Sequence, residues 1–322
     1  MKYRRLGRSG VRVSEVALGS WLTFGSAVGQ DATTACTRRA LELGINFLDT
    51  ADVYGRGAAE KALGAALEGV PRRSVFLATK SFWPTGEGPN DRGLSRKHVF
   101  EALHESLRNL RTDYVDLLQC HRYDPDTPLP EVVRAMDDLV RQGKVLYWGV
   151  SCWTGEQIAD ACRTTDLLGA PRPISNQPPY NLMDRAIEAE VVPVSRREGL
   201  SQVVFSPMAQ GVLSGKYRGG NVPSGSRGAD AQRRTWMQKY LDEPSTRKVE
   251  AFCGLAAEAG LAPSRLALAW CLRTEDVASA IFGATTVAQV DENAAAADVV
   301  LAPDLLRRLD DLFPPPPPPP AP

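Results

Sequence analysis

Short apolar runs alternate with longer helical windows along almost the whole chain. Eight of these runs have the length and composition of strands. They are VALG (from Val16), INFLD (from Ile45), VFLATK (from Val75), YVDLLQC (from Tyr114), VLYWGVS (from Val145), ISNQ (from Ile174), QVVFSP (from Gln202) and SAIFGA (from Ser279). Each is followed by a window with helical spacing, such as SRKHVFEALHESLRNL. Nearly continuous apolar strands that alternate with helices predict a parallel sheet covered by helices.

Eight strand–helix units in 322 residues predict an α/β fold, a closed (β/α)8 TIM barrel. A doubly wound open sheet is the alternative, but it usually has fewer units and a glycine fingerprint after its first strand. Here that turn reads GSWLTFGS, which is no fingerprint. We expect one domain over residues 1–313, then an extended, solvated polyproline tail over residues 314–322. The tail is either inert or a ligand for a proline-reading domain.

The composition argues against several classes of partner. The formal net charge is zero, so the chain has no excess of positive charge that would attract nucleic acid or an anionic membrane. The six cysteines stand singly, which indicates reduced thiols rather than disulfides or a zinc site. No run approaches the ~20 apolar residues of a membrane-spanning helix, and MKYRRLGRSG has no signal-peptide core. We expect a cytoplasmic protein with no nucleic-acid partner, no membrane insertion and no metal.

Two glycine-rich stretches resemble nucleotide-binding motifs but do not match them. GRGAAE, residues 55–60, has Glu60 in place of the third glycine of a dinucleotide fingerprint. GVLSGKY, residues 211–217, is one residue short of a P-loop and ends in Tyr217 rather than serine or threonine. We interpret the glycines of the first stretch as turn residues before a helix.

Ionisable side chains stand at the ends of three consecutive predicted strands. They are Asp49, Lys80 and His121, together with Tyr54 in the loop after Asp49. In a (β/α)8 barrel the active site lies at the carboxyl ends of the strands. Asp49 alone could cap a helix and His121 alone could be structural, but lysine is almost never buried without a partner. The other histidines, His98 and His104, lie in a charged helical window and are expected to be solvated.

These four types of side chain together suit a proton-transfer site. A phenol titrates near pH ~10, and a nearby lysine cation is expected to lower that value. An aspartate holds the lysine charged, and a histidine can hydrogen-bond a carbonyl oxygen. The set supplies a general acid for an alkoxide that forms on a carbonyl carbon. With no metal cluster and no nucleophile pair in the sequence, the missing reagent is a hydride, which implies a nicotinamide.

The ordered motifs of the chain resemble those of the aldo-keto reductases. They are GINFLDTADVYG, ATK, YVDLLQCH, GKVLYWGVS, NQPPYN, FSPMAQGVLSGKY and GATTVAQVDEN, and the similarity covers residues 3–313. The chain is most similar to the branch with the β-subunits of voltage-gated potassium channels and their bacterial relatives. The resemblance implies a barrel with an N-terminal β-hairpin and a C-terminal helix, and reduction of aldehydes or ketones with NADPH/NADP+. By motif, Tyr54 is the proton donor, Asp49 and Lys80 tune it, and His121 orients the carbonyl.

The resemblance also implies where NADPH binds. The residues around the nicotinamide are Ser20, Trp21, Ser151, Gln177 and Phe205, of which Phe205 stacks on the ring. Asp49 and Cys152 are also implied to bind the cofactor, Cys152 at a position linked to the pyrophosphate. Those that follow the pyrophosphate are Ser206, Pro207, Met208, Ala209, Gln210 and Gly211, with Lys216, Tyr217 and Arg227 in the long loop beyond. Those at the adenosine end are Gly283, Thr285, Gln289, Glu292 and Asn293. Phosphate sites in such barrels favour the loops after the seventh and eighth strands, which agrees with this placement.

Three positions depart from the channel branch. His121 stands where that branch has asparagine, Cys152 where it has arginine, and Ala27 where it has glutamine. Histidine is the general reductase pattern and favours working catalysis. The alternative is a redox-sensing regulatory subunit that binds NADP(H) tightly and turns over slowly. The long loop after Gly211 could cover the cofactor under either hypothesis.

Two further features concern the substrate and the assembly. Four aromatic residues in loops of the same rim either line an apolar or aromatic substrate pocket or simply pack the rim: Trp21, Trp83, Tyr123 and Trp153. The channel branch commonly forms tetramers or larger rings, so we expect a homo-oligomer. The terminal window APDLLRRLDDLF carries an apolar stripe that packs either on the barrel's own helices or on another subunit. The stripe is Leu305, Leu306, Leu309, Leu312 and Phe313.

Overall fold

Eight parallel strands form a closed barrel in the computed structural model, which describes residues 1–317 apart from the side chain of Gln232. They are β3 (Val16–Gly19), β4 (Phe47–Asp49), β5 (Phe76–Ser81), β6 (Val115–Cys120), β7 (Val145–Val150), β8 (Ser175–Asn176), β9 (Ser201–Val204) and β10 (Val277–Phe282). The strands pair in sequence order, and pairing of β10 with β3 closes the barrel. The predicted (β/α)8 barrel is confirmed. β5, β6 and β10 are buried at every position, which explains their continuous apolar runs.

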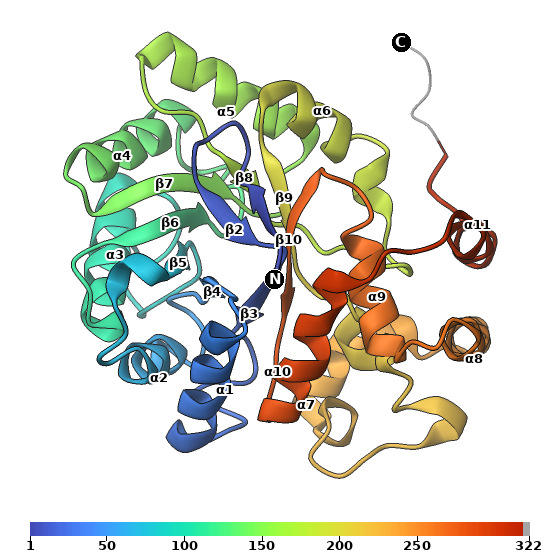
Figure 1. Ribbon diagram of the computed structural model, residues 1–322. Helices are drawn as coiled ribbons and strands as arrows, with labels where there is room; N and C mark the ends of the chain where they lie inside the picture. The colour runs from blue at the N-terminus through green and yellow to red at the C-terminus, as the bar shows by residue number, and fades with distance from the viewer. Residues whose placement is uncertain (318–322) are drawn as a thin grey trace.

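Helices surround the barrel in a ring (Figure 1). They are α1 (Gln30–Glu42), α2 (Ala58–Ala66), α3 (Arg96–Leu110), α4 (Leu129–Arg141), α5 (Gly155–Leu168), α6 (Val191–Glu198), α7 (Ala231–Arg234), α8 (Glu243–Glu258), α9 (Pro263–Cys271), α10 (Val287–Ala294) and α11 (Pro303–Leu312). Gly57, with φ +83°, is the N-cap of α2. The glycines of GRGAAE therefore form a turn before a helix, as the sequence predicted.

A short hairpin closes the amino-terminal end of the barrel. β1 (Tyr3–Arg5) and β2 (Arg12–Ser14) pair in antiparallel fashion, and Figure 1 shows the hairpin across the barrel end. Leu6 and Val13 are buried in one hydrophobic cluster with Phe47, Phe76 and Leu117 of the strands. Because this end is plugged by apolar side chains, a site for a polar cofactor is left to the carboxyl ends of the strands.

The unit that follows β9 departs from the simple strand–helix pattern. The chain passes through a series of short 3-10 turns and the four-residue α7 before α8 begins at Glu243. Several residues early in this segment have positive φ, among them Gln210 at +60° and Gly211 at +94°. Such a backbone cannot continue an α-helix. The helix expected directly after the seventh strand is therefore displaced by a long segment on the carboxyl-terminal rim.

The terminal helix α11 packs against α8 of the same chain. Leu309 and Phe313 are buried, and the ring of Phe313 lies edge-on to Phe252 with centroids 6.3 Å apart. The apolar stripe is thus covered at least in part by the protein's own helices. Residues 314–317 follow without regular structure, and residues 318–322 of the expected polyproline tail lie outside the described residues. Within residues 1–317, no helix has the length and apolar character needed to cross a membrane.

Candidate active site

A buried ion pair lies at the carboxyl ends of β4 and β5. Lys80 is inaccessible to solvent, and its Nζ lies 2.6 Å from Oδ2 of Asp49. The same ammonium donates to the carbonyl oxygen of Thr50 at 2.7 Å. The other Asp49 oxygen, Oδ1, accepts from Nε2 of Gln177 at 2.8 Å. The lysine expected to need a partner has one, and the aspartate is held from two sides.

Tyr54 and His121 lie directly against this pair. The hydroxyl oxygen of Tyr54 is 3.4 Å from Nζ of Lys80. The rings of Tyr54 and His121 meet edge-on with centroids 5.8 Å apart. The structure therefore brings all four side chains predicted at the strand ends into one cluster. Tyr54 comes from the short turn after β4, which holds it close to the end of that strand.

Burial sets the protonation states in this cluster. Desolvation, followed by the charge of Asp49, raises the pKa of Tyr54 well above its ordinary value. This is opposite to the direction expected from the lysine, because desolvation and the negative charge of Asp49 determine the shift of the Tyr54 pKa. Desolvation lowers the pKa of Lys80, while Asp49 opposes that shift. Desolvation, with the charges of Lys80 and Arg122, lowers the pKa of His121 well below its usual range. The phenol and the imidazole are therefore both neutral near pH 7.

The expectation that both other histidines are solvated is wrong for His98. Its side chain is buried on the inner face of α3, whereas His104 is half-buried beside Lys144. The charges in this window lie on the outer face of an amphipathic helix, and His98 shares the inner face with Val99 and Leu103. Composition of a window does not show which face of a helix a residue occupies.

Several residues implied for the nicotinamide line the same end of the barrel. Ser20 and Ser151 are buried, and the Ser151 hydroxyl donates to the Gln177 carbonyl at 2.8 Å. Cys152 follows with φ +57°, and Phe205 follows β9 in a half-buried position. Hydroxyl, amide and aromatic groups at the ends of four strands form a donor set that can hold a flat, polar ring such as a nicotinamide.

Backbone strain gathers at the implied pyrophosphate loop. The non-glycine residues Ser206, Ala209 and Gln210 have φ of +55°, +47° and +60°. Positive φ is costly for such residues and is concentrated at ligand sites. Pro207 is buried and Met208 half-buried between them. This strained turn fits a loop that presents its backbone to a phosphate group.

The long segment beyond this turn folds back over the first loop of the barrel. Trp236 packs edge-on to Trp21 with ring centroids 5.4 Å apart. The guanidinium of Arg227 lies 5.3 Å from the centroid of the Trp21 ring and donates to Oε1 of Gln210. The strained turn, the segment and the first loop are thus tied together at the rim.

Two cations of the segment can serve anionic groups of a cofactor. Lys216 is exposed, and a Cβ built on Gly211 would lie 3.3 Å from its Nζ. Arg227 is half-buried, and neither cation forms an ion pair with an acidic side chain in the described part of the chain. Tyr217 accepts a hydrogen bond from the backbone of Gly228 at 3.1 Å. Unpaired cations beside a strained turn suit a phosphate-bearing cofactor.

The implied adenosine residues lie in the turn before α10 and along that helix. The backbone N–H of Thr285 donates to Oε1 of Gln289 at 2.8 Å, and Thr286 caps the helix. Glu292 accepts from Ser264 of α9. Asn293 is buried, while Gly283 is exposed in the turn after β10. Glu292 therefore has a structural partner within the protein, whereas the helix start offers N–H groups to an anion.

Two residues near the cluster were not predicted from the sequence. Thr50 binds Lys80 through its backbone carbonyl and accepts from Ser20 through its hydroxyl at 2.8 Å. Arg122 lies one residue beyond His121, with its Nη1 3.5 Å from Oγ of Ser151. A contact made by a backbone carbonyl cannot be predicted from the residue type at that position. The arginine could have been noticed as a charge directly after a strand end.

The rim aromatics do not all face a pocket. Trp153 is buried in the main hydrophobic core and packs edge-on to Tyr123 at 4.9 Å between centroids. Its expected place on a substrate pocket is therefore wrong. Trp83 is 36% exposed and lies edge-on to His121 at 6.2 Å, so it does border the site.

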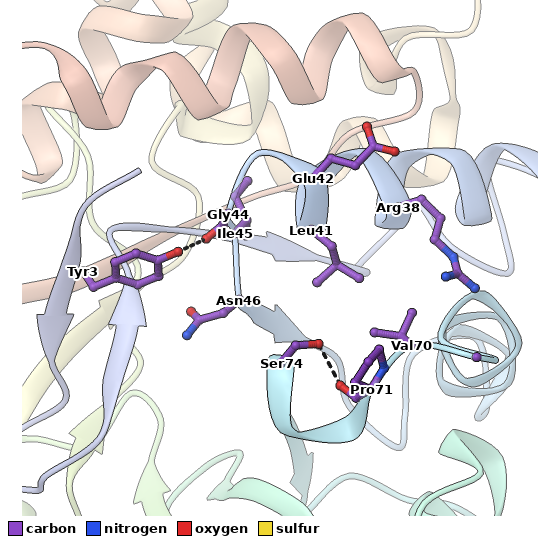
Figure 2. A pocket seen from close by; sticks show the side chains of 11 residues that line it. Tyr3, Arg38, Leu41, Glu42, Gly44, Ile45, Asn46, Val70, Pro71 and Ser74 are labelled. Carbon is purple, nitrogen blue, oxygen red and sulfur yellow. Dashed lines mark hydrogen bonds between the residues drawn. The ribbon is translucent and has the colours of Figure 1, made fainter.

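A hollow of about 460 Å³ lies elsewhere, at the amino-terminal ends of β4 and β5. Figure 2 shows that Tyr3 and Ser74 on its wall point their hydroxyls at the carbonyls of Gly44 and Pro71. It contains none of the predicted site residues, so it is not the candidate active site. Among residues 1–317, no group of three or more His, Cys, Asp or Glu side chains could hold a metal ion.

Comparison with known proteins gives a consistent result. A sequence profile described as "Aldo/keto reductase family" matches residues 15–313. A probable voltage-gated potassium channel subunit beta from Oryza sativa subsp. japonica is 41% identical over 315 residues, 96% of each chain. A protein of the same description from Arabidopsis thaliana is 40% identical over 97% of this chain and 96% of its own. A putative subunit from Schizosaccharomyces pombe is 38% identical over 96% of this chain and 92% of its own.

Proposed function

Because the chain belongs to the aldo/keto reductase family, we propose that it is an NADPH-dependent reductase that converts aldehydes or ketones to alcohols. The observation that carries the proposal is the cluster at the carboxyl ends of β4, β5 and β6. There Nζ of Lys80 lies 2.6 Å from Asp49 and 3.4 Å from the hydroxyl of Tyr54, with His121 against the Tyr54 ring.

Tyr54 is the proton donor in this proposal. Its raised pKa keeps the phenol protonated near neutral pH, and a donor must carry its proton at the start of the reaction. As the proton leaves, the neighbouring Lys80 ammonium stabilises the phenolate that forms. Asp49 keeps Lys80 charged and fixed, so the ammonium does not have to reorient during the reaction.

His121 orients the carbonyl oxygen. Its Nδ1 is buried and has no hydrogen-bond partner within the described residues. His121 is 7% exposed, and because Nδ1 contributes none of that surface, a ligand would meet the other ring nitrogen, Nε2. Because the ring is neutral, its N–H can hydrogen-bond a carbonyl oxygen without competing with Tyr54 as an acid.

NADPH, when bound, supplies the hydride that reduces the carbonyl carbon. Ser151, Gln177 and Phe205 would hold the nicotinamide. The strained turn from Ser206 to Gln210 would approach the pyrophosphate, and the unpaired cations Lys216 and Arg227 would bind phosphate groups. This charge pattern supports NADP(H) over NAD(H).

The test is NADPH oxidation by the purified protein with a panel of aliphatic and aromatic aldehydes. We expect Tyr54→Phe to lower the rate by about 10²–10⁴-fold, with NADPH affinity in a fluorescence titration retained. Tyr114→Phe, which removes a phenol at the opposite end of the barrel, is the matched control. Near-normal turnover in Tyr54→Phe would show that another group donates the proton.

A second candidate function is a redox-sensing regulatory subunit with slow turnover. Two observations favour it: the similar proteins described as potassium channel subunits, and the contact of Trp236 and Arg227 with Trp21, which would slow release of a cofactor. Multiple-turnover kinetics separate the two. Repeated turnover supports the reductase, whereas one cycle followed by retained NADP+ supports the sensor.

We further infer a reducing, cytoplasmic location. All six cysteines are free thiols, and five of them are buried. Free thiols in this number support a reducing compartment rather than a secreted environment.

A further inference from the structure

Arg122 places a positive charge at the mouth of the candidate active site. Its side chain is half-buried and follows His121 directly in the chain. Nη1 donates to the His121 carbonyl and lies 3.5 Å from Oγ of Ser151. The guanidinium also lies 5.6 Å from the centroid of the Trp83 ring. The backbone carbonyl, the serine and the indole therefore fix this arginine beside the reacting groups.

This charge has no acidic counterpart among the described residues. Lys80 is neutralised by Asp49 at 2.6 Å, but Arg122 forms no ion pair with an acidic side chain in residues 1–317. Within the same residues its Nη2 and Nε have no hydrogen-bond partner either. A partly desolvated guanidinium with free donors favours an anion that can pair with it.

The field of Arg122 reaches the groups that carry out the chemistry. Its charge lowers the pKa of His121 and of Lys80, and it acts against the upward shifts of Tyr54 and Cys152. A ligand bound at Tyr54 and His121 thus lies within range of the same charge.

We propose that Arg122 binds a carboxylate on the carbonyl substrate, so that the protein prefers aldehydes and ketones that carry a carboxylate. The free edge of the guanidinium offers Nη2 and Nε as a planar fork, which matches the two oxygens of a carboxylate. The flat face of Trp83 beside the guanidinium suits a planar group at this position. The inference rests on the proposed reductase function and specifies its substrate class.

A matched pair of aldehydes tests the proposal. Para-carboxybenzaldehyde and its methyl ester have the same ring and the same aldehyde but differ in charge. We expect a higher kcat/KM for the acid in the wild-type protein, and a fall of about 10–100-fold in the acid-to-ester ratio in Arg122→Met. The fall should appear mainly in KM for the acid. Arg122→Lys should restore part of the ratio, because it keeps the charge without the fork.

Two controls make the readout specific. Arg92→Met removes an exposed cation from the loop after β5 on the same rim, and it should leave the acid-to-ester ratio at the wild-type value. NADPH affinity should be the same in Arg122→Met and wild type. The ortho and meta acids repeat the comparison with the carboxylate at other distances from the aldehyde.

The outcomes separate failure of this inference from failure of the proposed function. Reduction of acid and ester with equal kcat/KM at every ring position, in both wild type and Arg122→Met, would overturn the inference and leave the reductase intact. A loss of NADPH affinity in Arg122→Met with an unchanged ratio would assign the arginine to the cofactor instead. No reduction of any aldehyde by the wild-type protein would contradict the proposed function itself.

Discussion

Tyr54 determines how the proposed reaction should depend on pH. Burial and Asp49 raise its pKa well above the ordinary value, so the phenol stays protonated across neutral pH. His121, whose pKa is lowered, also stays neutral there. We expect kcat/KM for carbonyl reduction to be flat from about pH 6 to 9. The reverse oxidation of an alcohol needs the phenolate as base, so its rate should rise with pH over the same range.

Steady-state profiles measured in both directions check this expectation. Tyr54→Phe should remove the rise in the oxidation profile, because the titrating group is then absent. A reduction rate that falls with an apparent pKa near neutrality would show that the donor's pKa is lowered, not raised.

Part of the candidate active site could be predicted from the sequence, and part could not. Asp49, Lys80 and His121 end strands of one barrel, so their meeting follows from topology alone. The side-chain direction of Arg122 depends on contacts with Ser151 and Trp83, which lie in other loops. The direction of the Tyr54 pKa shift depends on desolvation, which a sequence does not display. Both required the three-dimensional structure.

Among the elements, the long segment after β9 bears on cofactor choice. Lys216 is exposed beside the backbone of Gly211 and has no acidic partner among the described residues. We expect Lys216→Ala to weaken NADPH binding by about tenfold and NADH binding much less, because only NADPH has the 2′-phosphate. Fluorescence titration with both cofactors measures the two dissociation constants.

Arg234→Ala is the control for this variant, because it removes an exposed cation from the same segment. It should affect both cofactors little. If Lys216→Ala weakened the binding of NADH and of NADPH equally, the result would show that the lysine does not bind the 2′-phosphate.

Arg4 contributes polar contacts to the attachment of the amino-terminal hairpin, besides the apolar packing of Leu6 and Val13. Arg4 donates to the carbonyls of Leu272, Thr274 and Val277 at 2.6–2.7 Å and pairs with Glu15 at 2.8 Å. Arg4→Ala leaves these acceptors to water or without a partner. We expect it to lower the free energy of unfolding by about 2–4 kcal/mol, as measured by urea denaturation.

Arg5→Ala provides the comparison, since Arg5 is exposed on the same strand. Its effect should lie within about 0.5 kcal/mol of wild type, as for other surface substitutions. Equal destabilisation by both changes would mean that strand propensity, not the carbonyl contacts of Arg4, holds the hairpin.

The elements themselves were largely predictable from periodicity. All eight barrel strands overlap the apolar runs, although β10 begins two residues before its run and β8 keeps only Ser175–Asn176. The late start of α8 was not predictable, because it follows from positive φ at residues such as Ser206 and Ala209, which are not glycines. Backbone strain that is imposed by the surrounding structure cannot be predicted from the conformational propensities of the residues.

For the whole molecule, we expect a homo-oligomer. Zero net charge gives little long-range repulsion between copies. Because α8 partly covers α11, the terminal apolar stripe is a poor candidate for the contact between subunits. The sequence alone could not show whether this stripe packs on the protein's own helices or on another subunit. Light scattering should give a mass that is a multiple of 35.0 kDa. A mass of 35.0 kDa that does not change on concentrating would contradict the expectation.

The closure of the barrel by β10 against β3 also affects how the chain can fold during synthesis. β3 leaves the ribosome long before its partner, residues 277–282, because more than 250 residues separate the two strands. The carbonyls that hold Arg4 are made equally late. Until then β3 and β9 both expose unpaired edges, and such edges can pair with another chain. The free edge of β3 therefore stays open to pairing with another chain until residues 277–282 have been made.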